Sequence, residues 1–156
     1  MVAGRPETRP WRRGIRWSLA VAAGVLALVA LAGMRVNVAI ADSGNSTVAG
    51  SFRTAVAQAG TATGWAPWMK QGWVSLGVAQ LGEGDRSAAA PSFRRATAES
   101  PNDWRAWFDL ALATGGAERI AALGRAQALN PRDPAVTALT ARLNWTAARP
   151  ARVRRT

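Results

Sequence analysis

The stretch from Lys70 to Pro101, KQGWVSLGVAQLGEGDRSAAAPSFRRATAESP, decides the fold. Apolar and small residues recur at helical spacing on both sides of a Gly-Glu-Gly-Asp turn, as they do in two antiparallel helices. Large, small and breaker residues then recur after roughly 30 to 34 residues, which is typical of stacked helical hairpins that each bury their apolar face on a neighbour. The two matching sets are Trp73, Leu76, Gly77, Ala89, Phe93, Ala96 and Pro101, and Trp107, Leu110, Ala111, Leu123, Ala126 and Pro131.

Small residues explain how the two helices of a hairpin approach each other. Gly77 and Ala89 remove bulk where the antiparallel helices meet, and Phe93 fills the space beside them. Each hairpin is followed by a proline and then by an aspartate, Asp103 or Asp133, which predicts a helix stop and a new N-cap. We therefore expect an all-α fold in which the hairpins are separated by short turns.

The segments on either side complete the expected organisation. Gly44 and Asn45 predict a turn, Thr47 is the expected cap of a helix from Val48 to Ala59, and residues 60–64 are expected to form a loop. The predicted parts are a basic cytoplasmic N-terminus (1–16), a transmembrane anchor helix and its extension (17–41), a degenerate half-repeat and loop (47–65), a repeat (66–101), a shortened repeat (102–131), a capping helix (132–146) and a disordered basic tail (147–156).

An uncharged apolar run from Trp17 to Met34 predicts one membrane span. At about 1.5 Å per residue its 18 residues would cover about 27 Å, which is close to the hydrocarbon thickness of a bilayer. A core helix that also borders solvent would carry a polar stripe, and this run has none. A cleaved signal peptide remains the alternative because Ala39 and Ala41 resemble a cleavage site, although the long apolar run and Arg35 count against it.

The basic residues around this run predict its orientation. Five arginines precede it, whereas Arg35 and Asp42 balance each other after it. We expect a single-pass protein of the cell membrane, with its N-terminus in the cytoplasm and its repeats outside. Trp65, Trp68, Trp104 and Trp145 are expected in loops or at the membrane surface.

Composition argues against catalysis and against nucleic acid as a partner. The chain has no cysteine and no histidine, one lysine and nine acidic residues, so it lacks the commonest nucleophiles, bases and metal ligands. We expect no enzyme activity, no cofactor and no metal. The net charge of +11 is concentrated at the two ends, which does not give the continuous basic face that follows a phosphate backbone.

The repeated residues resemble the tetratricopeptide repeat family over roughly residues 48–143, and most closely from Lys70 to Pro101. Gln80 and Thr114 stand where the family usually has a tyrosine. The resemblance implies that an extended peptide binds along the face made by the first helices. Only Arg105 is available for a terminal carboxylate, so an apolar partner segment is expected instead. The alternative is that these side chains are core. The implied residues are Gln71, Val74, Val78, Arg105, Phe108, Asp109 and Leu112.

A looser resemblance concerns residues 102–131, which are similar to the repeats that end O-antigen ligase-like membrane proteins of high-GC bacteria. The multispan catalytic region of those proteins is not present in this chain. We expect a membrane-anchored scaffold that docks envelope proteins or peptides and contacts the bilayer through residues 17–34, in support of envelope polysaccharide assembly. The alternatives are an accessory part or detached fragment of an O-antigen ligase-like enzyme, and a secreted binding protein.

Overall fold

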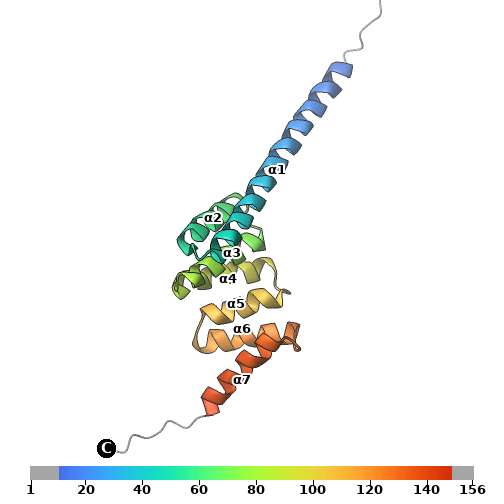
Figure 1. Ribbon diagram of the computed structural model, residues 1–156. Coiled ribbons are helices and arrows are strands. Elements are labelled where there is room, and N and C mark those ends of the chain that lie inside the picture. Colours follow the sequence, from blue (N-terminus) through green and yellow to red (C-terminus); the bar gives the residue numbers. More distant parts are fainter. Residues whose placement is uncertain (1–10, 149–156) are drawn as a thin grey trace, which may run out of the picture.

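The computed structural model describes residues 11–148, and within that range every regular element is a helix (Figure 1). This confirms the predicted all-α fold with an apolar N-terminal helix followed by hairpins. The predicted N-terminus (1–16) and tail (147–156) lie partly outside the described residues. The elements in order are α1 (Trp11–Val48), α2 (Phe52–Trp65), α3 (Lys70–Gly82), α4 (Arg86–Glu99), α5 (Trp104–Ala113), α6 (Gly116–Leu129) and α7 (Pro134–Ala148).

Helix α1 has two differently surrounded parts. From Val21 to Met34 its large apolar side chains are exposed, and this part belongs to a stretch, Val21–Val48, that is long and apolar enough to cross a membrane. From Val36 onward the same helix packs against α2 and α3, where Val36 is buried with Ala62 and Ala66. Figure 1 shows the first part projecting from one end of the stack, with α7 at the other end.

The predicted turn at Gly44 and Asn45 is wrong, because α1 continues through both residues to Val48. Thr47 does not cap the next helix either; its hydroxyl donates to the carbonyl of Ser43 within α1 (2.8 Å). Contacts with α2 hold this part helical. Ser43 is fully buried and its hydroxyl donates to the carbonyl of Ala55 (3.1 Å), which offsets the weak helix propensity of the local sequence.

Helix α2 completes a first hairpin with the end of α1. It spans Phe52–Trp65 instead of the predicted 48–59, so the predicted loop at 60–64 is helical. Its buried residues Ala55, Ala59 and Ala62 each lie 34 positions before a buried residue of α4. The expected half-repeat is therefore a whole hairpin, whose first helix is the last part of α1.

The α3–α4 hairpin shows the predicted close approach of its helices. A Cβ atom added to Gly77 would lie 2.7 Å from the ring of Phe93, which is fully buried. Gly82 has a similar role that the sequence did not reveal, since it ends α3 directly under the ring of Phe52 from α2. Asp85 caps α4 by accepting a hydrogen bond from the amide of Ala88 (2.9 Å).

The α5–α6 hairpin is shorter than the one before it. Helix α5 has 10 residues, whereas α3 has 13, and only Thr114 and Gly115 separate α5 from α6. Leu110 and Leu123 from this hairpin join Phe93 in the main buried cluster. As predicted, Asp103 caps α5; its carboxylate accepts from the amide of Arg105 (3.0 Å).

Successive hairpins are linked by the same hydrogen bond twice. The indole Nε1 of Trp73 donates to the carbonyl of Pro67 (2.7 Å), and Trp107, 34 residues later, donates to the carbonyl of Pro101 (2.8 Å). Each proline therefore ends one hairpin and accepts a bond from the first helix of the next. An ion pair between Lys70 Nζ and Asp103 Oδ2 (2.5 Å) also joins the starts of α3 and α5.

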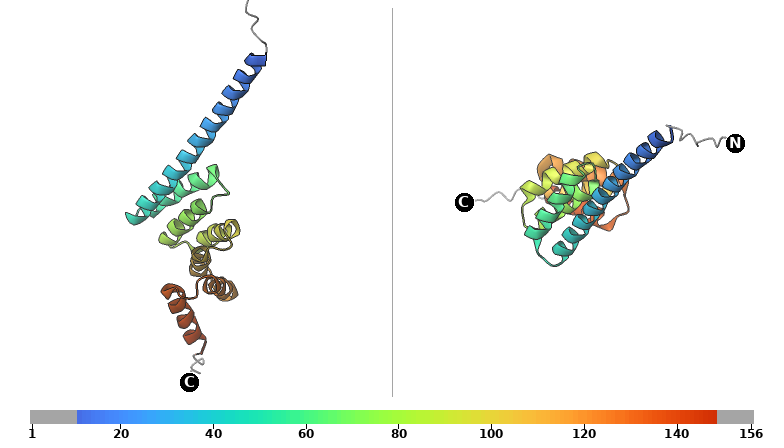
Figure 2. Two further views of the ribbon diagram at one scale, coloured as in Figure 1. Left: turned by 90° about the vertical axis from the view of Figure 1, so that its right-hand side faces the viewer. Right: turned by 90° about the horizontal axis from the view of Figure 1, so that it is seen from above.

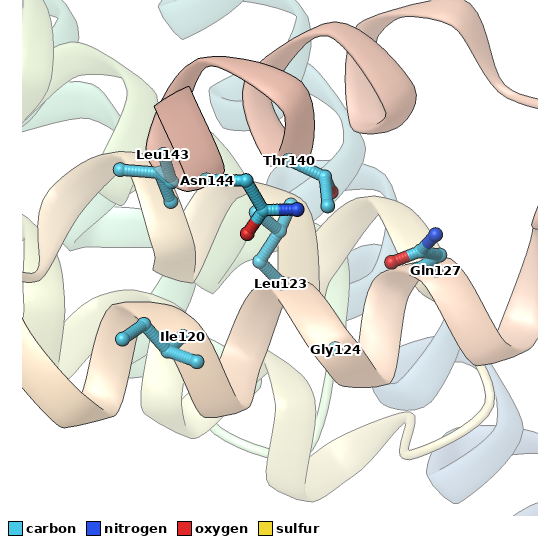
Figure 3. Close-up of a pocket in the computed structure, with 7 residues that line it drawn as sticks. All are labelled: Ile120, Leu123, Gly124, Gln127, Thr140, Leu143 and Asn144. Atoms are coloured by element: carbon cyan, nitrogen blue, oxygen red, sulfur yellow. The ribbon is translucent and has the colours of Figure 1, made fainter. Parts of the chain in front are cut away.

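Helix α7 closes the stack only in part. Val136 is fully buried, and Leu139 and Leu143 pack beside it against the main cluster. On the outer side, Ile120 of α6 stays 67% exposed, and a cavity of about 200 Å³ remains between α6 and α7 (Figure 3). The predicted capping helix is present, but it leaves some of the apolar surface that it was expected to cover.

We predict that Gly77→Ala destabilises the chain by about 1 to 3 kcal/mol, because the new methyl group must displace the buried ring of Phe93. The matched control is Gly124→Ala in α6, where nothing lies within 4 Å of the added methyl group; it should be neutral or stabilising by about 0.5 to 1 kcal/mol. Urea unfolding of the full chain in uncharged detergent, followed by circular dichroism, measures both. Equal effects of the two substitutions would contradict the account.

Candidate functional site

The candidate site is the surface of α3 and α5 that the sequence singled out. The first helices of successive hairpins lie against each other, α1 against α3 and α3 against α5. Val78 and Leu112 are each 38% exposed, while Val74 and Phe108 are partly buried. We call this surface the α3/α5 face. Its residues are Gln71, Val74, Val78, Arg105, Phe108, Asp109 and Leu112.

The α3/α5 face is built from matching positions. Val74 and Phe108 are 34 residues apart, as are Val78 and Leu112 and also Gln71 and Arg105, so each pair has the same place in its hairpin. Residues three and four apart share one side of a helix, which lines the apolar members up across the two helices.

Burial separates the members of the α3/α5 face. Phe108 packs against the main buried cluster and has a structural role. Val78 and Leu112 remain open to solvent in the C-terminal halves of their helices. The alternative that these side chains are core therefore applies more to Phe108 than to Val78 and Leu112.

The prediction from the sequence did not include the corresponding positions on α1. One repeat before Gln71, Val74 and Val78 lie Asn37, Ile40 and Gly44, of which Ile40 is partly buried and the other two are exposed. The predicted turn at Gly44 concealed them. Extending the 34-residue period backward from Trp73 was the signal that could have found them.

The face carries an unusual carboxylate. The pKa of Asp109 is raised to about 6, mainly because the carboxyl is buried; the negative charge of Asp103 adds to the rise and the positive charge of Arg105 opposes it. Asp103 differs: burial raises its pKa, but the bonds from Lys70 and from the amide of Arg105 outweigh this and lower it. Arg105 also lies over the ring of Trp104, 5.0 Å from its centroid.

The rest of the site is chemically sparse. Within residues 11–148 there is no group of three or more acidic, cysteine or histidine residues that is placed to hold a metal ion. Arg105 is the only cation among the residues of the α3/α5 face. The arrangement is therefore suited to covering apolar side chains of a partner, with one cation and one weakly acidic carboxyl at its side.

Two solved structures with similar folds were determined with bound peptides. The first tetratricopeptide domain of Spaghetti (RPAP3), solved with the HSP90 peptide SRMEEVD, aligns with a TM-score of 0.71 at 13% identity, over 74% of this chain and 95% of that one. The type III secretion chaperone SycD of Yersinia enterocolitica, solved with a peptide of the translocator YopD, aligns with a TM-score of 0.61 at 18% identity, over 70% and 86%.

Comparison of the sequence with known families and curated proteins identifies no relative. No family model matches the chain, and no curated protein matches it. The structural likeness shows that the chain has a tetratricopeptide-repeat-like fold. The looser resemblance to O-antigen ligase-like proteins gains no support from these comparisons.

We predict that Asp109→Asn stabilises the protein above pH 6. Between about pH 4 and 6 native Asp109 keeps a proton that the unfolded chain has lost, so wild-type stability falls as the pH rises and levels off above about 6. The asparagine variant has no such loss of stability. Its free energy of unfolding at pH 7.5 should therefore exceed that of the wild type by on the order of 1 to 2 kcal/mol, a value reduced to allow for the partial exposure of Asp109.

Urea unfolding of both proteins from pH 4 to pH 8 measures this difference. The exposed Glu83→Gln is the control for the loss of one negative charge. A gain for Asp109→Asn that is the same at pH 4.5 and pH 7.5 would contradict the assignment.

Proposed function

We propose that this chain is a membrane-anchored docking module that binds an extended or helical segment of another protein on the α3/α5 face. The observation that carries the proposal is the pair of exposed apolar side chains, Val78 and Leu112, at matching positions on adjacent helices. Two structures of similar fold were solved with bound peptides, which supports a protein or peptide as the partner.

The chemistry of the face favours an apolar partner segment. Val78 and Leu112 are exposed, Val74 and Phe108 are partly buried beside them in the sequence of each helix, and a partner side chain that covers the exposed pair removes apolar area from water. Arg105 alone does not form the several-residue clamp that a terminal carboxylate needs. We propose no catalysis, because the face has no nucleophile with an adjacent base.

Anchoring in the membrane is the second part of the proposal. The exposed apolar section of α1 supports it, as do Trp65 and Trp68, which are 56% and 68% exposed in and after the end of α2. The residues beside them, Ala66 and Met69, pack at Val36, where that section ends. Figure 2 shows the connection between α2 and α3 on the side of the stack from which α1 projects. Indole rings at that level are typical of a membrane interface.

A finer proposal concerns the pathway. A supporting part in envelope polysaccharide assembly rests on the resemblance of residues 102–131 alone, with the repeats outside the cytoplasm. Purification of the crosslinked full chain from its native envelope tests this proposal. Recovery of a multispan polysaccharide enzyme would support it, and recovery of none would contradict it.

We predict that Val78→Glu and Leu112→Glu each weaken partner capture by about tenfold or more, because each places a charge where an apolar contact of the partner is proposed. Ile120→Glu is the matched control, because Ile120 is 67% exposed on α6, away from the face. Crosslinking of intact cells followed by quantitative mass spectrometry measures capture.

Phe108→Glu tests the partly buried end of the face, and circular dichroism must show that each variant is folded. If the folded Val78→Glu and Leu112→Glu variants retained every partner, the proposal would be contradicted.

We predict that brominated phospholipid quenches the fluorescence of Trp65 and Trp68 in vesicles that contain the full chain. The emission of this pair is the difference between the wild type and the Trp65→Phe/Trp68→Phe variant. The Trp104→Phe variant gives the control, because Trp104 begins α5 and packs against the main buried cluster, instead of lying in a loop or at the membrane surface as predicted. Quenching of the pair well beyond that of Trp104 is expected. Equal emission of the pair in brominated and ordinary vesicles would rule out the interfacial position.

A further inference from the structure

A second cavity, of about 430 Å³, lies where the stack becomes irregular. Its walls come from the start of α4, the end of α5, the start of α6 and the later part of α7. Three arginines from three different helices line it: Arg86, Arg119 and Arg142. Leu112 and Leu139 form part of its apolar wall.

The shortened hairpin accounts for this cavity. In the preceding hairpin the last turn of α3 carries the buried Ala79 and ends at Gly82 beneath Phe52. Helix α5 ends three residues sooner, so it has no equivalent turn beside α7. We call the space left there the arginine pocket.

The charge of the arginine pocket is not neutralised from within. None of its lining residues is acidic. Among residues 11–148 the carboxylates that form ion pairs are bound to other cations, Lys70, Arg94 and Arg95. Three positive charges therefore line the cavity with no carboxylate among them, and an anion bound there would be attracted by all three.

One of the three guanidinium groups is already held in place. Arg119 Nε donates to the carbonyl of Ala111 at the end of α5 (3.0 Å), and its two terminal nitrogens have no partner within the described part of the chain. Arg86 and Arg142 are exposed side chains from α4 and α7 that line the same cavity. Guanidinium groups bind oxyanions through paired N–H donors, which fits carboxylate groups.

We propose that the arginine pocket binds adjacent acidic side chains of the peptide segment that docks on the α3/α5 face. Leu112 belongs to both the face and the pocket, so the two surfaces are continuous. The volume exceeds what one carboxylate needs, and the leucine wall fits the methylene groups of glutamate side chains. This inference rests on the proposed function. It adds that the partner segment carries acidic side chains next to the apolar part that docks on the α3/α5 face.

The position of the pocket disfavours the phosphate of an anchoring membrane as its ligand. The cavity lies against α7, and α7 and the exposed part of α1 are at opposite ends of the stack (Figure 1). A peptide that runs along the α3/α5 face reaches the pocket directly at Leu112.

The test uses the full chain in uncharged detergent at low salt, with acetylated tetraglutamate amide as the probe and NMR of the arginine Nε groups as the readout. The Arg86→Gln/Arg142→Gln variant should bind tetraglutamate about tenfold or more weakly than the wild type does. The matched control, Arg53→Gln/Arg132→Gln, removes the same charge from exposed positions elsewhere and should bind like the wild type. Circular dichroism confirms that both variants are folded.

Three outcomes would overturn the inference: no binding by the wild type, equal binding by the two double variants, or inorganic phosphate binding as tightly as tetraglutamate does. The Val78→Glu variant separates this inference from the proposed function. It should bind tetraglutamate normally while it loses its protein partners. Failure of tetraglutamate binding alone would therefore leave the α3/α5 face untouched.

Discussion

Close contact between paired helices, made where one of them presents a glycine or a small polar residue, holds this structure together. The ring of Phe93 lies on Gly77, the ring of Phe52 lies on Gly82, and the hydroxyl of buried Ser43 reaches the carbonyl of Ala55. Any larger side chain at these places would push the helices apart. The bonds from Trp73 and Trp107 to the preceding prolines then set each hairpin on the last one.

The fold was predictable where bulky residues alternate with small ones. Residues 70–131 have tryptophan, leucine and phenylalanine at the repeat spacing, and their helices were predicted correctly. The first hairpin was misread because its contacts are made by Ser43, Ala55 and Ala59, which carry no large apolar signal, while Gly44 and Asn45 resemble a turn. Tertiary contacts overrode local propensity there.

The sequence predicted which residues belong to the candidate site, but not how exposed or how charged their surroundings are. The repeat spacing gives Val78 and Leu112 the same place in their hairpins, yet their exposure and the burial of Phe108 follow from the three-dimensional arrangement. The pKa of Asp109 depends on Asp103 and Arg105 as well as on burial. The arginine pocket brings together arginines from three helices beside the shortened end of α5, and no local pattern relates Arg86 to Arg142.

One continuous helix, α1, is both the proposed membrane anchor and the first helix of the stack. This leaves no linker between them, so the α3/α5 face would keep a fixed direction relative to the bilayer. Amide hydrogen exchange across residues 41–48, in the full chain in lipid nanodiscs, tests this continuity most directly. The account predicts protection comparable to that of α3, whereas rapid exchange beginning at Gly44 would contradict it.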